Sequence, residues 1–455
     1  MSGVTALFEP TSVVLLGSSE IQEVIGMASP QLFISVIHNM KKYFEGKTYV
    51  LDIKEGKDYK KLEELPETPE LAVIMLPPNV SVQQSEACAK IGVKALVAIT
   101  GGYKTSQRQQ LKDLTNEYDI RILGPNTIMG IINTTNGLNT TFERNMMPTR
   151  GGISVVSQSG GVGACLLDWI CFYKIGAAKF AFTGDKIDVN EVDLLRYLNK
   201  DPKTKAVCLY MEGIENGRDF IEVAQDVVES KPILTLKGGV TEGAAQRALS
   251  HTTSIAGSDT IVDAAFKKAG IIRVENEEEL LNAAIALVKQ PILGGDNIAV
   301  VSNVGGPAIL AADAVVKNGL KLANLAEDTK RRIGRQYPRL DVVNPIDLIA
   351  DARADRFTFV LDIVLSDPNV DGIVVINMLK SCFFKPRDAV AIAEISEKHP
   401  SKPVVDVPGG GEDFTYVHKI LQDTNIPVYN TPEKAAKALG TLRRRHRTRA
   451  RTDES

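Results

Sequence analysis

The sequence has few cysteines, a single tryptophan and no long apolar run. Its cysteines are scattered, and no two form a CxxC pair, which argues against a disulfide framework and a zinc site. No apolar run approaches the ~20 residues needed to cross a bilayer. The first residues, MSGVTALFEP, lack the basic and apolar parts of a signal peptide. We therefore expect a soluble, cytoplasmic protein with no membrane partner.

Neither sign of charge is in excess. The chain has 53 Lys+Arg against 56 Asp+Glu, a formal net charge of −3. Nucleic-acid binding needs a surplus of basic residues, so we expect no nucleic-acid partner. The 455 residues are enough for about three domains of roughly 150 residues each. The Arg-rich C-terminus, residues 443–455, is expected to be a solvated, disordered tail.

Short β-branched runs alternate with amphipathic segments, which is typical of βαβ units and parallel sheets. In residues 1–146 the expected strands are Ser12–Leu16, Thr48–Leu51, Leu71–Leu76, Ala95–Ile99 and Ile120–Leu123. This pattern predicts a doubly wound α/β domain. A linker is expected at Glu143–Arg150, which is polar and contains a proline.

The remaining chain contains an internal repeat. Three pairs of segments match in layout: Ile153–Gly161 with Ile298–Gly306, Lys231–Gly239 with Lys402–Gly410, and Gly270–Glu278 with Asn425–Glu433. We therefore expect two doubly wound domains of one fold, residues 147–292 and 293–442. After the second matching segment, the first copy has 31 residues up to and including Gly270, and the second has 15 up to and including Asn425. The sister copy folds without this insertion, so the insertion is a candidate for function.

His251 lies in the insertion, within the small polar segment Ser250–Gly257 (SHTTSIAG). An imidazole that titrates near neutrality can attack as a nucleophile and later leave. The alternative is a solvated loop histidine or part of a helix-capping cluster. On the residues alone, both interpretations stay open.

Two glycine turns each follow a buried strand and precede a helix. The first glycine turn consists of Gln158, Ser159, Gly160 and Gly161, and the second of Asn303, Val304, Gly305 and Gly306. Such turns point backbone N–H groups and the positive end of a helix at an anion. Neither continues with Gly-Lys-Ser/Thr, so neither is a Walker P-loop. The alternative is tight strand-to-helix packing, but one turn in each repeat favours phosphate binding.

Glu212 follows the expected strand Ala206–Met211, at the carboxyl end where open α/β sheets bind ligands. A carboxylate there could orient a histidine ring and stabilise its charge. The alternatives are a capping or solvated glutamate, or the nearby Glu215 in the same role. In the first domain Gly17 starts a turn, but the next glycine is Gly26, so the GxGxxG fingerprint is missing.

The segment around His251 resembles the phosphohistidine loop of the nucleotide-diphosphate-forming acyl-CoA synthetases, relatives of succinyl-CoA synthetase. The resemblance covers roughly residues 5–440. The order of the domains is similar to that in the alpha subunits of the archaeal ADP-forming enzymes. It implies a Rossmann-like CoA-binding domain followed by two flavodoxin-like domains. Thr253 stands where this family usually has glycine, and Leu51-Asp52-Ile53 where it commonly has Val-Asn-Pro.

The resemblance also implies roles for individual residues. His251 would carry the phosphoryl group, and Glu212 would hold the opposite ring nitrogen. The two glycine turns would bind the phosphohistidine. The residues implied to surround CoA are Gly17, Ser18, Ser19, Lys54, Pro77, Pro78, Thr100 and Asn126.

The implied reaction converts acyl-CoA, ADP and phosphate reversibly into acid, CoA and ATP, a substrate-level phosphorylation. The sequence contains no recognisable ATP-grasp domain. ADP or ATP and Mg²⁺ are therefore expected mainly on a separate ATP-grasp beta subunit, in an α2β2 heterotetramer acting on a small acyl substrate. Two alternatives are a non-catalytic CoA sensor and a nicotinamide-dependent dehydrogenase. The missing GxGxxG fingerprint argues against the dehydrogenase.

Overall fold

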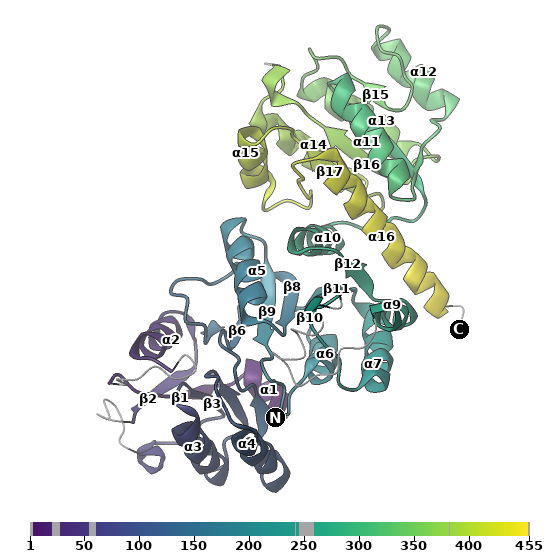
Figure 1. Cartoon of the computed structure of the whole chain (residues 1–455). Helices are drawn as coiled ribbons and strands as arrows, with labels where there is room; N and C mark the ends of the chain where they lie inside the picture. Colours follow the sequence, from purple (N-terminus) through teal and green to yellow (C-terminus); the bar gives the residue numbers. More distant parts are fainter. Residues whose placement is uncertain are drawn as a thin grey trace. The chain divides into compact units, whose positions relative to one another are not determined.

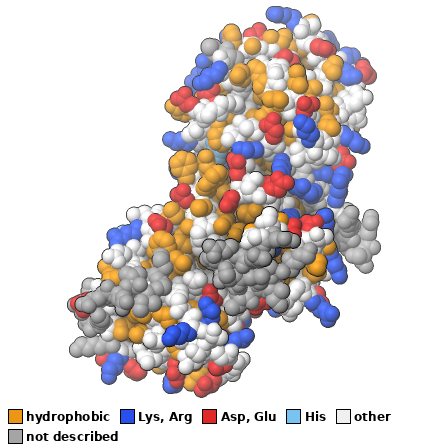
Figure 2. Space-filling view, in the orientation of Figure 1, with side chains coloured by type: hydrophobic (Ala, Val, Ile, Leu, Met, Phe, Trp, Pro, Cys, Tyr) orange, Lys and Arg blue, Asp and Glu red, His pale blue; other side chains and the backbone are white. Residues whose placement is uncertain are grey.

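The computed structural model describes residues 3–20, 28–53, 61–241, 243–244, 259–381 and 383–453. The chain folds as two compact units, Met1–Glu275 and Asn276–Ser455. Figure 1 shows sheets covered by helices in both units. On the face drawn in Figure 2, basic and acidic side chains are interspersed over each unit. None of the helices in the described ranges combines the length and the apolar character that crossing a membrane requires.

The first unit begins with a sheet of five parallel strands in the order β2-β1-β3-β4-β5. Its strands are β1 (Ser12–Gly17), β2 (Lys47–Asp52), β3 (Leu71–Ile74), β4 (Ala95–Ala98) and β5 (Arg121–Leu123). Its helices are α1 (Gly3–Phe8), α2 (Pro30–Tyr43), η1 (Leu62–Glu64), α3 (Pro78–Lys90) and α4 (Thr105–Glu117). The chain adds β2 on one side of β1 and β3 on the other, so the topological switch point lies between β1 and β3.

The second sheet of this unit has seven strands in the order β12-β11-β10-β8-β9-β6-β7. Its strands are β6 (Ile131–Asn133), β7 (Leu138–Asn139), β8 (Arg150–Ser157), β9 (Ala177–Phe182), β10 (Ala206–Met211), β11 (Ile233–Lys237) and β12 (Ile272–Val274). Its helices are α5 (Gly160–Phe172), α6 (Glu191–Lys200), α7 (Gly217–Ser230) and α9 (Asp259–Lys268). Strands β9 and β10 lie on opposite sides of β8, which places the switch point between β8 and β10.

Strands β6 and β7 lie within the range expected for the first domain, but they belong to the second sheet. β6 pairs antiparallel with β9, and β7 pairs with β6 at the edge. Ile131, Ile132 and Leu138 are fully buried there, and burial of these apolar side chains favours the pairing. The structural transition from the first sheet to the second therefore follows β5, before the linker that the sequence suggested.

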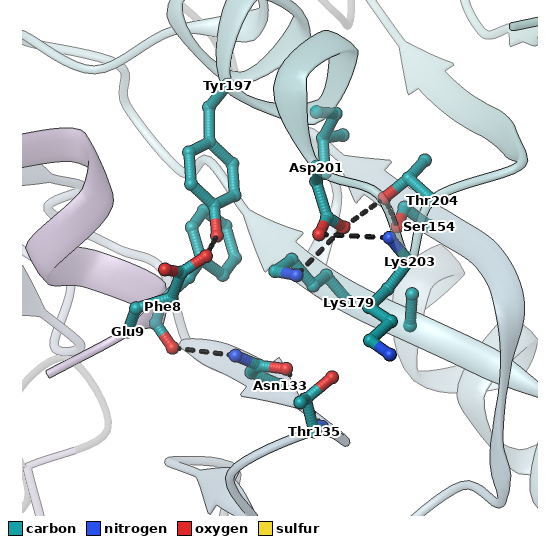
Figure 3. A network of polar contacts seen from close by, with 12 residues as sticks. Phe8, Glu9, Asn133, Thr135, Ser154, Lys179, Tyr197, Asp201, Lys203 and Thr204 are labelled. Carbon is teal, nitrogen blue, oxygen red and sulfur yellow. Dashed lines mark hydrogen bonds and ion pairs between the residues drawn. The ribbon is translucent and has the colours of Figure 1, made fainter.

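A network of polar and aromatic contacts joins the two sheets of the first unit (Figure 3). Phe8 stacks on Tyr197, whose hydroxyl donates to Glu9 at 2.6 Å. Next to this contact, Lys179 pairs with Asp201 at 2.8 Å, and both side chains are buried. Burial alone would raise the pKa of Asp201, but hydrogen bonds from Lys179 and its other neighbours hold it below its ordinary value. The Asp201 carboxylate thus stays ionised, and its contact with Lys179 anchors α6 to the sheet.

The second unit has a parallel sheet in the order β14-β13-β16-β17, with β15 paired to β13. Its strands are β13 (Asn297–Ser302), β14 (Lys321–Leu322), β15 (Ile346–Asp347), β16 (Gly372–Ile376) and β17 (Val404–Val407). Its helices are α10 (Glu277–Lys289), α11 (Gly305–Lys317), α12 (Glu327–Gln336), α13 (Ala354–Ser366), η2 (Leu379–Ser381), η3 (Pro386–Asp388), α14 (Ala389–Lys398), α15 (Glu412–Leu421) and α16 (Pro432–Asp453). The predicted class, a Rossmann-like domain followed by two flavodoxin-like doubly wound domains, is confirmed.

The Arg-rich C-terminus is helical, whereas the sequence suggested a disordered tail. Helix α16 continues through it to Asp453. Arg443 and Arg447 both bind the carboxylate of Asp296, at 2.6 and 2.9 Å. Arginine is also a good helix former, so these contacts prolong a helix that has already begun.

A buried acid lies near the carboxyl end of β17. Asp406 and Asn377 are fully buried and hydrogen-bonded to each other through the Asn377 amide. One acceptor oxygen of each, Asn377 Oδ1 and Asp406 Oδ2, has no partner in the described chain. Burial raises the pKa of Asp406 to about 8. Both oxygens are buried acceptors that lack a donor, so the site favours the protonated acid, whose O–H is a donor.

Replacing Asp406 with asparagine is expected to stabilise the protein more at pH 8.5 than at pH 5.5. An unfolded aspartate has a pKa of about 3.9. The raised folded value means that the stability contributed by the neutral acid is present below about pH 4 and is lost as the pH rises through about 8. An amide at this position supplies the missing donor without titrating, for a gain of about 1–3 kcal/mol at pH 8.5. Thermal melting of both proteins at the two pH values measures this, and an equal gain at both would contradict it.

Candidate functional site

Five of the expected CoA residues lie at the switch point of the first sheet. Gly17 ends β1 and is followed by Ser18 and Ser19, while Pro77 and Pro78 follow β3 and begin α3. Ser19 Oγ is buried and has no hydrogen-bond partner in the described chain, so it can accept a ligand contact. The glycine at position 17 has a packing reason. A Cβ there would lie 2.2 Å from the ring of Phe33.

Thr100 and Asn126 lie together at the same edge of the sheet. The Thr100 side chain is fully buried, and its hydroxyl donates to the Leu76 carbonyl at 2.7 Å. The main-chain N–H of Asn126 donates to the main-chain carbonyl of Thr100 at 2.9 Å. The Asn126 side chain is exposed and donates to Asp185 at 3.2 Å. Thr100 therefore stabilises this edge of the sheet from inside the protein. Of the two residues, only Asn126 is exposed and can reach a ligand.

The segment that carries Asn126 leads directly to the first glycine turn. Two residues further on, the Ile128 side chain lies 3.6 Å from where a Cβ of Gly160 would be. Both residues belong to the first unit. The edge of the first sheet that carries the expected CoA residues, called the CoA edge below, is therefore a neighbour of the N-terminus of α5. A ligand that extends along this edge would bring its end close to the turn.

The first glycine turn lies at the switch point of the second sheet. Ser159 caps α5 by accepting from the Val162 amide at 3.3 Å. The amides of Gly160 and Gly161 begin the helix, where N–H groups lack intrahelical partners. The Gln158 side chain is buried and its Nε2 has no partner in the described residues. These donors fit a phosphate or phosphoryl group.

Glu212 follows β10 on the other side of the same switch point. Gln158 Oε1 accepts from the amides of Glu212 and Gly213 at 2.7 and 3.2 Å. The hydroxyl of Tyr210 donates to the Glu212 carboxylate at 3.2 Å. These contacts place the main chain of Glu212 beside the first glycine turn. Its rival Glu215 is exposed.

Two lysines hold the carbonyl groups of this turn. Lys237 donates to the carbonyls of Glu212, at 2.8 Å, and of Gly238. Lys186 donates to the Gly213 carbonyl at 3.2 Å and pairs with Glu191 at 3.1 Å. Both lysines are buried, and burial lowers the pKa of Lys237. The site thus combines helix N–H groups, the Glu212 carboxylate and two buried amines, one of which is paired with Glu191.

The second glycine turn repeats part of this arrangement in the second unit. Asn303 Oδ1 accepts from the Met378 amide at 2.8 Å, as Gln158 does with Glu212. Val304 is the N-cap of α11 and supplies no side-chain cap. A Cβ at Gly305 would lie 3.6 Å from a carboxylate oxygen of Asp347, whereas a Cβ at Gly306 would meet nothing within 4 Å. A carboxylate of the chain itself thus already lies beside this helix end.

Several expected residues fall outside the described part of the chain. His251 and the rest of its segment lie there, as does Lys54. Within the described ranges, no group of three or more His, Cys, Asp or Glu residues is placed to hold a metal ion. The four described cysteines, Cys88, Cys165, Cys171 and Cys208, are free.

The sequence analysis did not select Tyr210, Lys186 or Lys237, although they contact the Glu212 turn. Tyr210 and Lys237 lie in apolar strands, and nothing in their local sequence distinguishes them from other strand residues. A column-by-column comparison of the repeats carries a signal, because Lys237 stands where the second copy has Pro408.

Two family models match the first unit and its boundary. The model of the succinyl-CoA ligase like flavodoxin domain matches residues 150–287, and that of the CoA binding domain matches residues 36–133.

Full-length relatives and solved structures are also similar. The alpha subunit of ADP-forming acetate–CoA ligase II from Pyrococcus furiosus is 34% identical over 450 residues, covering 96% of each chain. The ADP-forming acetate–CoA ligase of Methanocaldococcus jannaschii is 36% identical over 446 residues, covering 95% of this chain and 62% of that protein. The structure of dinucleotide-forming acetyl-coenzyme A synthetase 1 from Candidatus Korarchaeum cryptofilum, in complex with phosphate and ADP, superimposes with a TM-score of 0.90 at 31% identity. It matches 100% of this chain and 99% of that chain.

Proposed function

Because this chain belongs to the family of the alpha subunits of ADP-forming acetate–CoA ligases, we propose that it converts acyl-CoA, ADP and phosphate reversibly into the free acid, CoA and ATP. The observation that carries the proposal is the convergence of the first glycine turn and Glu212 at one switch point. The CoA edge of the first sheet lies in the same unit. A dehydrogenase or a non-catalytic CoA sensor is not favoured, because the full-length relatives are ligases.

The proposed reaction has three steps. Phosphate attacks the thioester carbonyl carbon, the C–S bond breaks, and CoA leaves as the thiol after taking up a proton. A ring nitrogen of His251 then attacks the phosphorus of the acyl phosphate, and the P–O bond to the acid breaks. The phosphoryl group finally passes from His251 to ADP. A covalent carrier of this kind divides one transfer between two separate sites.

The chain's residues take distinct parts in this scheme. The amides of Gly160 and Gly161 and the free Nε2 of Gln158 donate to the phosphoryl oxygens, which carry about two negative charges. Glu212 stabilises the positive charge of the His251 ring. The second glycine turn is the weaker phosphate candidate, because the Asp347 carboxylate lies beside it and repels an anion.

A partner subunit is the other part of the proposal. The P. furiosus relatives are named as alpha subunits, and this chain spans 62% of the M. jannaschii ligase. We infer that an ATP-grasp beta subunit holds the nucleotide and Mg²⁺ in an α2β2 assembly, and that the acyl substrate is small. A cytoplasmic location is proposed on the scattered, free cysteines.

The isolated chain is expected to bind CoA but to make no ATP from acetyl-CoA, ADP and phosphate. Isothermal titration with CoA and a coupled ATP assay measure the two properties. Addition of the partner subunit should restore ATP synthesis without changing the CoA affinity of the chain by more than about twofold. Robust ATP synthesis by the chain alone would contradict the division of labour.

A further inference from the structure

Hydrogen bonds hold the turn after β10 at its amides, at its carbonyls and at the carboxylate of Glu212. Gln158 accepts from the amides of Glu212 and Gly213, and Lys237 donates to the Glu212 carbonyl at 2.8 Å. Tyr210 donates to the Glu212 carboxylate at 3.2 Å. A Cβ at Gly238 would lie 2.5 Å from the Tyr210 hydroxyl, so this hydroxyl is packed against the main chain of the neighbouring strand. One residue, Glu212, is the common endpoint: Gln158 and Lys237 bond its main chain, and Tyr210 bonds its carboxylate.

The second repeat shows this turn without the tyrosine and lysine contacts. Ser157 pairs with Tyr210 across β8 and β10, and Ser302 pairs with Ile376 across β13 and β16. Two residues further along, Glu212 therefore corresponds to Met378. Ile376 has no hydroxyl, and Pro408, which corresponds to Lys237, has no amine.

The amide brace is nevertheless common to both repeats. Asn303 bonds the Met378 amide as Gln158 bonds the Glu212 amide. The shared brace belongs to the fold, since both copies need it to close the turn. The tyrosine, the lysine and the glutamate occur together in one copy and are together absent from the other.

Lys231 makes the same kind of contact as Lys237 but lies away from Glu212, so comparing the two lysines distinguishes a structural role of Lys237 from a functional one. It begins the same sequence segment and donates to the carbonyls of Leu198 and Asp201, both at 2.6 Å, near the amino end of β11. Burial lowers the pKa of both lysines. Both lysines donate hydrogen bonds to main-chain carbonyls at a strand end, but only Lys237 does so next to Glu212.

We propose that Tyr210 and Lys237 are positioning residues for phosphoryl transfer, which hold Glu212 ready for a histidine and confine this chemistry to the first repeat. This inference rests on the proposed function. The charged groups around Glu212 come from several elements: Lys237 on β11, Lys186 before α6, and the pair of Asp259 on α9 with Arg273 on β12, which acts on Lys237. Tyr210 donates to the Glu212 carboxylate and so holds its direction.

The test uses the chain together with its partner subunit. Phosphorylation of His251 from γ-labelled ATP with Mg²⁺, turnover with acetyl-CoA from pH 5.5 to 9, CoA affinity and melting temperature are measured. Tyr210→Phe is expected to lower turnover about three- to tenfold. Lys237→Met is expected to lower labelling and turnover at least about tenfold, with CoA affinity changed by less than about twofold.

Two variants control for loss of the same kind of contact elsewhere. Tyr49 donates to Glu67 at 3.0 Å on β2, so Tyr49→Phe removes a tyrosine–glutamate bond away from the site. Lys231→Met removes a lysine that bonds two carbonyls. Both controls are expected to keep turnover within about twofold of the wild type. Equal losses in the controls and the test variants would overturn the inference.

Double variants separate this inference from the proposed function. In a Glu212→Gln background, Tyr210→Phe should change turnover by less than about twofold, because the carboxylate that it holds is gone. Multiplicative losses would overturn the positioning role. If Glu212→Gln alone were fully active, the proposed role of Glu212 would fail. If Glu212→Gln were slow while Tyr210→Phe and Lys237→Met were fully active, only the positioning inference would fail. Should Lys237→Met not fold, Tyr210→Phe and its double variant decide the matter.

Discussion

Replacement of His251 by alanine is expected to abolish labelling of the chain by γ-labelled ATP and to lower turnover at least about a thousandfold. The imidazole is the proposed covalent carrier, and alanine offers no atom to accept the phosphoryl group. The measurement is incubation of the chain and its partner subunit with labelled ATP and Mg²⁺, followed by denaturing electrophoresis at neutral and acidic pH. A phosphohistidine label should be lost in acid.

His38→Ala is the matched control for this experiment. His38 lies on α2, where its Nε2 is 3.3 Å from the side-chain oxygen of Asn145, and it has no place in the proposed chemistry. It should keep full labelling. Acid-labile label remaining on His251→Ala would show that another residue carries the phosphoryl group.

Glu212→Gln is expected to lower turnover about ten- to a hundredfold while CoA affinity stays within about twofold. The amide keeps the shape of the side chain but removes the charge that stabilises the His251 ring. Loss of one such charge-assisted contact costs about 1.5–3 kcal/mol. Steady-state rates with acetyl-CoA and a CoA titration of the same variant give the two quantities.

Glu215→Gln is the comparison for Glu212→Gln, because it is the nearby rival and its side chain is exposed. It should retain nearly full turnover. The reverse result, a slow Glu215→Gln and an active Glu212→Gln, would assign the role to Glu215.

The sequence was informative about the site where function depends on chain order. The alternation of strands and helices predicted the parallel sheets. In such sheets the residues after each strand meet at one edge, so Glu212 and Gln158 could be expected near each other. The repeat predicted two copies of the glycine turn, and the structure shows the same amide brace in both.

The sequence was less informative where function depends on side-chain direction. Thr100 follows β4 closely, as a ligand-binding residue would, but its hydroxyl donates inward to the Leu76 carbonyl. The glycine at position 17 makes room for Phe33. Asp347 was not considered, because nothing in its local sequence shows that it approaches the N-terminus of α11 from another strand. These contacts depend on packing between segments far apart in the chain.

Strands β6 and β7 have a consequence for expressing parts of this protein. A fragment that starts at residue 147 would lack both strands and would leave the β9 edge unpaired, with open N–H and C=O groups. Such an edge pairs readily with other chains, so this fragment would be prone to aggregate. The complementary fragment 1–146 would carry the buried Ile131, Ile132 and Leu138 without the sheet that covers them. A cut after Glu275 would instead keep both sheets of the first unit whole.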